Sequence, residues 1–134
     1  MTVHPFIVHY AVAFLSVLPL VWLALCVRQR QGLRWVFWSM AIAGMLAAMG
    51  AVITGELAQT DVEKLEPLKS EQVAYHETLA YWTVIAYAAA ILWVLARHRK
   101  MGRKEQWLLA VVLFGCAVLL LFAAAAGGAI FHPG

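Results

Sequence analysis

Residues 4–27 read HPFIVHYAVAFLSVLPLVWLALCV, a run without a single Asp, Glu, Lys or Arg. About 20 apolar residues in a helix are enough to cross a hydrocarbon core of about 30 Å, so this run is long enough to span a membrane. Residues 35–55, 78–96 and 106–134 are also free of these charged side chains. The sequence therefore predicts four membrane-spanning helices.

The composition supports this fold class. Hydrophobic residues make up 64% of the chain and charged residues 13%, whereas an average soluble domain has about 25% charged residues. The alternation of apolar and polar residues expected in a membrane β-barrel is absent. We expect an all-α polytopic membrane protein, an antiparallel four-helix bundle in the lipid bilayer. Residues 1–134 would form one membrane domain, with helices at about 5–27, 34–55, 73–97 and 106–131.

Charge distribution predicts the orientation. The connections 28–34 and 97–105 hold eight basic residues: Arg28, Arg30, Arg34, Arg97, Arg99, Lys100, Arg103 and Lys104. The connection 56–77 holds two lysines and six acidic residues. The positive-inside rule then places the two basic connections in the cytoplasm and both termini outside. We interpret the net charge of +3 as a topology signal with a modest attraction to anionic lipid, because no nucleic-acid motif accompanies the basic residues.

Four of the five histidines fall at one end of this predicted bundle. Alternating helix directions bring His4, His9, His76 and His132 to the outer side, whereas His98 lies among the basic residues. An ionisable side chain at membrane depth indicates a functional site, and His9 and His76 are within about one turn of the apolar zone. His4 and His9 are five residues apart and so differ by about 140° around a helix, which argues against a shared coordination sphere. We therefore expect His9 and His76 to act as a pair.

Two imidazoles beside small residues favour haem b. Imidazole ligates haem iron, and a flat porphyrin needs a slot between helices lined by small and aromatic side chains. The residues expected to form this slot at the outer end are Gly55, Gly127, Gly128 and Tyr10. Two histidine ligands leave no open position on the iron, so we expect electron transfer to a redox protein or a quinone rather than oxygen chemistry.

Two other functions remain open. A copper or zinc site could use His9 and His76 with His4 and His132 as further ligands, supported by Glu56 or Glu77. Alternatively, the chain is a non-catalytic assembly subunit whose glycine rows pack against a partner or a second copy in a homodimer. A hydrolase or transferase is disfavoured, because no Ser, His and Asp set suggests an activated nucleophile.

Four short motifs suggest a family. The sequence has HPFIVHY at 4–10, TGE at 54–56, a histidine at 76 and GGAIFHPG at 127–134. In this order they resemble the bacterial four-helix membrane proteins of the domain of unknown function 2231 family, over essentially the whole chain. The chain departs from the family pattern at Tyr10-Ala11, where Phe-Pro is usual, at Phe131, where Tyr is common, and at Pro133. The resemblance implies a bacterial inner-membrane location. Relatives fused to Rieske-type iron–sulfur domains make electron transfer the activity that the resemblance implies.

Overall fold

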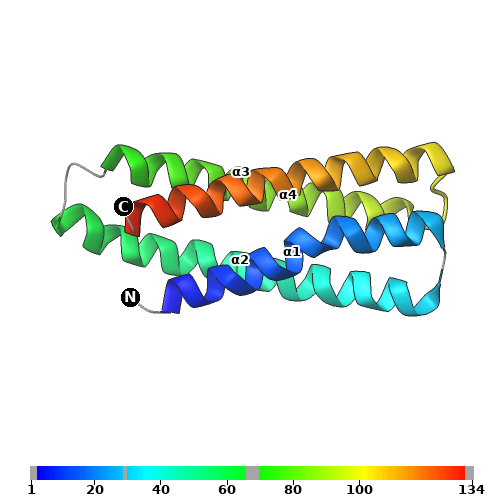
Figure 1. Cartoon of the computed structure of the whole chain (residues 1–134), viewed down its shortest axis with the longest axis horizontal. Helices are drawn as coiled ribbons and strands as arrows, with labels where there is room; N and C mark the ends of the chain where they lie inside the picture. Colours follow the sequence, from blue (N-terminus) through cyan, green and yellow to red (C-terminus); the bar gives the residue numbers. More distant parts are fainter. Residues whose placement is uncertain (1–2, 29, 66–69, 132–134) are drawn as a thin grey trace.

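A computed structural model describes residues 3–28, 30–65 and 70–131, and the side chains of 7–28, 30–55 and 74–126. Its helices are α1 (Val3–Val27), α2 (Gln31–Leu65), α3 (Ser70–Arg97) and α4 (Arg103–Phe131). They form an elongated antiparallel bundle in which α1 packs on α2 and α4, and α3 packs on the same two helices (Figure 1). The all-α four-helix prediction is confirmed.

Each helix holds a segment long and apolar enough to cross a membrane. These segments are Ile7–Val27, Gln31–Gly55, Ala74–Arg97 and Arg103–Ala126. The short α1–α2 and α3–α4 connections lie at one end of the bundle, which we call the basic end because residues 28–34 and 97–105 carry the basic cluster (Figure 1). The start of α1, the end of α2, the start of α3 and the end of α4 lie at the other end, the histidine end.

The second helix continues well past its apolar segment. It runs to Leu65, so residues 56–65 extend α2 by almost three turns into the region that the sequence analysis assigned to a connection. Similarly, α4 begins at Arg103, before its apolar stretch. These extensions contain Glu, Leu, Ala, Gln and Lys, which favour helix regardless of hydropathy.

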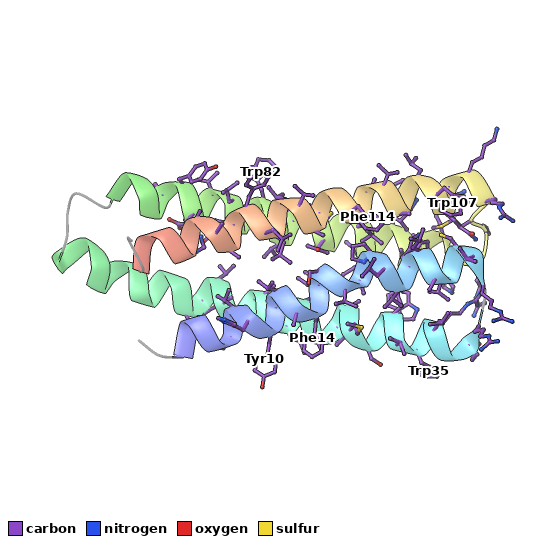
Figure 2. All side chains as sticks on the ribbon, in the orientation of Figure 1. Tyr10, Phe14, Trp35, Trp82, Trp107 and Phe114 are labelled. Atoms are coloured by element: carbon purple, nitrogen blue, oxygen red, sulfur yellow. The ribbon has the colours of Figure 1, made fainter. Side chains whose placement is uncertain are left out.

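Apolar side chains cover both the inside and the outside of the bundle. Leu15, Leu18, Leu109 and Leu113 are fully buried, while many equally large apolar residues face outward and contact lipid. Aromatic residues lie along the outside of the bundle: Trp35 and Trp107 are near the basic end, and Tyr10 and Trp82 are closer to the middle (Figure 2). A pair of Trp residues near one end of the bundle, such as Trp35 and Trp107, is typical of a membrane–water interface.

At Gly44, side chains of α1 pack closely against the backbone of α2. A Cβ added at Gly44 would lie 2.6 Å from Leu15 Cδ2 and 3.2 Å from Phe14 Cβ. Real Cβ atoms do not come this close, so α1 occupies the space that the missing side chain leaves. The small residues of α2 therefore serve helix packing here, as they do at many interfaces between membrane helices.

A proline in α1 is matched by a tyrosine in α3. Pro19 lies inside α1 and has no backbone N–H, so it cannot donate to the carbonyl of Leu15 one turn earlier. The Tyr87 hydroxyl donates a hydrogen bond to that same carbonyl oxygen at 2.9 Å. Tyr87 and Leu15 are both fully buried. In a membrane, where water is scarce, a backbone carbonyl freed by proline needs such a partner.

Candidate functional site

The half of the bundle nearer the histidine end contains a small, partly open cavity to which all four helices contribute. Its volume is about 60 Å³, and its only titratable lining residue among the side chains that the structure describes is His76 of α3. The remaining lining consists of small or branched apolar residues and one threonine: Val8, Ala11, Val12, Ala48, Ala51, Val52, Ala80, Thr83, Val84, Leu120, Ala123 and Ala124. A single imidazole therefore lies in a largely apolar setting.

The imidazole of His76 is fixed by a carbonyl of the neighbouring helix. His76 Nδ1 lies 2.8 Å from the backbone oxygen of Ala123 in α4. A carbonyl can only accept a hydrogen bond, so Nδ1 carries the proton, and in neutral histidine Nε2 keeps its lone pair. Metal-ligating histidines commonly have this arrangement, in which one ring nitrogen donates to a backbone carbonyl while the other binds the metal.

The inward stripe of α3 begins with His76. Ala80 and Thr83 follow it at helical spacing and also line the cavity, and Tyr87 is buried one turn further along. The Thr83 hydroxyl donates to the Leu79 carbonyl of its own helix at 2.6 Å. This hydrogen bond uses the hydroxyl proton, so Thr83 can offer a ligand in the cavity only its oxygen lone pairs.

His9 faces away from this cavity. Its neighbour Val8 lines the cavity, but His9 is about 100° further around α1 and is exposed on the outside of the bundle, as are Ala13 and Leu20 of the same stripe. His9 takes part in an interaction of its own. The structure thus brings His9 and His76 to similar depth in the bundle without bringing both onto one cavity.

The other residues expected at the site are placed as follows. Tyr10 is 49% exposed, stacks on Phe14 with ring centroids 6.2 Å apart, and points outward (Figure 2). Gly55 is partly buried in α2, next to Thr54, whose hydroxyl donates to the Gly50 carbonyl. The side chains or surroundings of His4, Glu56, Gly127 and Gly128 lie outside the described set, although their backbones are helical, and His132 lies outside the described residues altogether.

Three or more metal-ligating side chains do not come together anywhere among the side chains of residues 7–28, 30–55 and 74–126. Glu77 follows His76 on α3 and is half-buried. A copper or zinc site that includes His9 and His76 would therefore need His4 and His132 to supply its third and fourth ligands.

Two features of the site were not predicted from the sequence. One is the hydrogen bond to the Ala123 carbonyl. Every residue has a backbone carbonyl, so the sequence does not show which one on the neighbouring helix His76 contacts. The other is the tightness of the cavity, since rows of alanine and glycine are compatible with both an open slot and close helix packing. The direction of His76 did have a signal, namely its stripe with Ala80, Thr83 and Tyr87.

The fold and this site define a multi-pass membrane protein, a four-helix bundle with a histidine-lined cavity near one end. The chain belongs to the family described as "Predicted membrane protein (DUF2231)", whose profile matches residues 1–131. No curated protein and no solved structure matches the chain.

Proposed function

We propose that this membrane protein binds haem b with His76 as an axial ligand and transfers electrons. The observation that carries the proposal is the hydrogen bond from His76 Nδ1 to the Ala123 carbonyl at 2.8 Å. It fixes the ring and leaves Nε2 as the nitrogen that can bind iron. When bound, haem would supply one-electron chemistry for a redox protein or a quinone in the membrane.

The donor chemistry of His76 fits haem, but the cavity is too small for a porphyrin. Pockets for drug-sized ligands typically measure roughly 300–1,000 Å³, whereas this cavity measures about 60 Å³. The proposal therefore requires the helices around His76 to move apart on binding. Among the described residues, α2 and α3 pack least extensively of the four adjacent pairs, so we expect this pair to separate most easily.

His9 remains the proposed second ligand. His9 is exposed on the outer face of α1, so it could bind a haem at the surface of the bundle more readily than a haem in the interior. Haem held by His76 of one chain and His9 of a second chain in a homodimer would reconcile this exposure with bis-histidine ligation.

Absorption spectra of the purified protein test the proposal. Protein made with an ample haem supply is expected to show a Soret band, and an α band after reduction with dithionite. His76→Ala and His9→Ala should each remove or shift these bands, while His98→Ala, which changes an exposed histidine at the basic end, should leave them unchanged. Wild-type protein without porphyrin absorbance would rule haem out.

A copper or zinc site is the first alternative. Metal analysis of protein purified without a polyhistidine tag distinguishes it from haem, since stoichiometric copper or zinc without porphyrin would favour the bare metal. The small cavity favours the second alternative, a non-catalytic assembly subunit. In that case a His9→Ala/His76→Ala double variant would accumulate in the membrane and form its complexes as the wild type does.

We further propose that the protein lies in the bacterial inner membrane with both termini outside. The basic end, with eight Lys and Arg residues in its two connections and the adjoining helix ends, would then face the cytoplasm. The histidine end and its cavity would face the periplasm, where a redox partner of the proposed haem would dock.

A further inference from the structure

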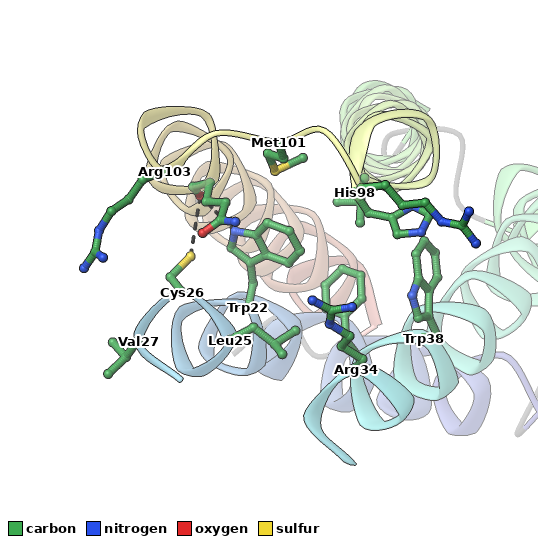
Figure 3. Close-up of a pocket in the computed structure, with 13 residues that line it drawn as sticks. Trp22, Leu25, Cys26, Val27, Arg34, Trp38, His98, Met101 and Arg103 are labelled. Carbon is green, nitrogen blue, oxygen red and sulfur yellow. Dashed lines mark hydrogen bonds between the residues drawn. The ribbon is translucent and has the colours of Figure 1, made fainter. Parts of the chain in front are cut away.

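The basic end has a second and larger cavity, which we call the basic pocket. Its volume is about 460 Å³, within the range of pockets that hold small ligands. It is lined by residues from all four helices and the α3–α4 connection: Trp22, Leu25, Cys26, Val27, Arg34, Phe37, Trp38, Val94, His98, Arg99, Met101, Arg103 and Gln106 (Figure 3).

The floor of the basic pocket is aromatic and buried. Trp22 and Phe37 are 7% and 1% exposed, with ring centroids 5.3 Å apart, and Trp38 stands edge-on to Phe37 at 5.4 Å. The indole N–H of Trp22 donates to the Gln106 carbonyl at 2.9 Å, which fixes the ring across the α1–α4 interface (Figure 3). The floor is thus an apolar surface in which the Trp22 ring is held by a hydrogen bond.

The rim of the basic pocket is cationic. Arg34, Arg99 and Arg103 line it from α2, the α3–α4 connection and α4, and their side chains are exposed. His98 lies over the Trp38 side of the pocket (Figure 3), where its Nδ1 is 3.1 Å from the Leu95 carbonyl, which leaves Nε2 for another partner. None of the described lining residues is acidic. The nearby Glu105 pairs instead with Arg97, whose Nε lies 3.0 Å from both carboxylate oxygens.

The position of the basic pocket indicates the source of its ligand. Trp35 and Trp107 mark a membrane–water interface at this end, so the pocket lies at the depth of lipid headgroups (Figure 2). An apolar floor with Arg34 beside it and Arg99 and Arg103 at its edges fits a molecule with an anionic head and an apolar body (Figure 3). Basic pockets between membrane helices are suited to anionic lipid headgroups.

We propose that the basic pocket binds the phosphate headgroup of an anionic phospholipid, with the upper part of the lipid against Trp22, Phe37 and Trp38. Arg34 comes from the α1–α2 hairpin, and Arg99 and Arg103 from the α3–α4 hairpin. One headgroup therefore bridges the two hairpins, and bound lipid stabilises the bundle against unfolding. The proposal does not depend on haem, because the histidine site lies at the opposite end of the bundle.

Thermal unfolding in mixed micelles tests this proposal. Phosphatidylglycerol in neutral detergent is expected to raise the unfolding midpoint of the wild type, whereas phosphatidylcholine and inorganic phosphate should have little effect. The pocket variant Arg34→Gln/Arg99→Gln/Arg103→Gln should bind phosphatidylglycerol at least about tenfold more weakly in titrations of the midpoint shift, because it lacks the cations that hold the headgroup.

The matched control is Arg28→Gln/Arg30→Gln/Lys104→Gln, which removes three charges from the same end outside the basic pocket. It should keep the response of the wild type. Equal weakening in both triple variants would overturn the proposal in favour of diffuse surface attraction. An equal effect of phosphatidylcholine, or of inorganic phosphate alone, would overturn an anionic phospholipid as the ligand. Comparing unfolding without lipid shows that each variant is folded before its lipid response is read.

Discussion

At the scale of single residues, the Tyr87 hydroxyl provides a hydrogen-bond donor that Pro19 removes from α1, a role that could not be predicted from the sequence. Pro19 leaves the Leu15 carbonyl without its usual helix donor, and Tyr87 donates to it from α3. The signal was a proline in α1, but choosing its partner required the packing of two helices. A membrane sequence gives little help with that choice, because lipid-facing and core-facing positions are equally apolar.

Tyr87→Phe should therefore destabilise the bundle. The change keeps the ring and leaves a buried carbonyl without a donor, which costs about 1–3 kcal/mol. In a Pro19→Ala background the backbone N–H returns and can donate to Leu15, so the same tyrosine change should cost distinctly less. Thermal or denaturant unfolding of the four proteins in this double-mutant cycle measures the difference. Equal losses in both backgrounds would mean that the hydroxyl does not act through the carbonyl freed by Pro19.

Because lipid-facing and core-facing positions are equally apolar, the sequence could predict the direction of His76 but not that of His9. His76 shares its stripe with Thr83 and Tyr87, polar groups that membrane helices keep inside, so its inward direction could be predicted. His9 shares its stripe with Ala13 and Leu20, which are equally suited to lipid and to protein. The sequence could therefore place His9 at the correct end of the bundle but could not fix the face of α1 on which it lies.

At the scale of helices, hydropathy predicted how many there are and roughly where they cross the membrane. It could not predict where α2 ends, because the stretch from Glu56 to Leu65 loses apolar residues while its backbone still favours helix. Hydropathy also could not distinguish a slot for a ligand from a groove filled by another helix along the rows of alanine and glycine in α2. At Gly44 the groove is filled by Leu15 and Phe14 of α1.

Gly44→Ala should consequently disturb the α1–α2 interface. The added methyl group would lie 2.6 Å from Leu15 Cδ2, so the side chain of Leu15 or the helix itself must shift, at a cost of about 1–3 kcal/mol. Gly115→Ala is the matched control in α4, because no atom lies within 4 Å of its added Cβ and alanine favours helix over glycine. Unfolding midpoints in detergent should fall for the first variant and hold or rise for the second. A Gly44→Ala protein as stable as wild type would show that Leu15 accommodates the methyl group freely.

At the scale of the whole molecule, His9 and His76 of one chain face different surroundings, so the homodimer version of the haem proposal can be tested by mixing chains. In a dimer that contains one His9→Ala chain and one His76→Ala chain, one of the two shared sites keeps both native histidines. Co-expression with two different affinity tags, followed by purification through both, isolates this mixed dimer. It should recover about half the haem of the wild type, whereas each variant alone binds none in bis-histidine form. Recovery of no haem would exclude a shared site.

The proposed orientation can be tested on the two ends of the same bundle. In a chain whose native Cys26 and Cys116 are replaced by alanine, Gly102→Cys puts a thiol into the exposed α3–α4 connection, and Ser70→Cys puts one at the start of α3. If the eight basic residues hold their connections in the cytoplasm, a membrane-impermeant maleimide should label Ser70→Cys in intact cells and Gly102→Cys only after permeabilisation. The reverse pattern would place the histidine end in the cytoplasm and the basic pocket in the outer leaflet. Because Gly102 has no atom within 4 Å of an added Cβ, the new thiol should not disturb the connection that it reports on.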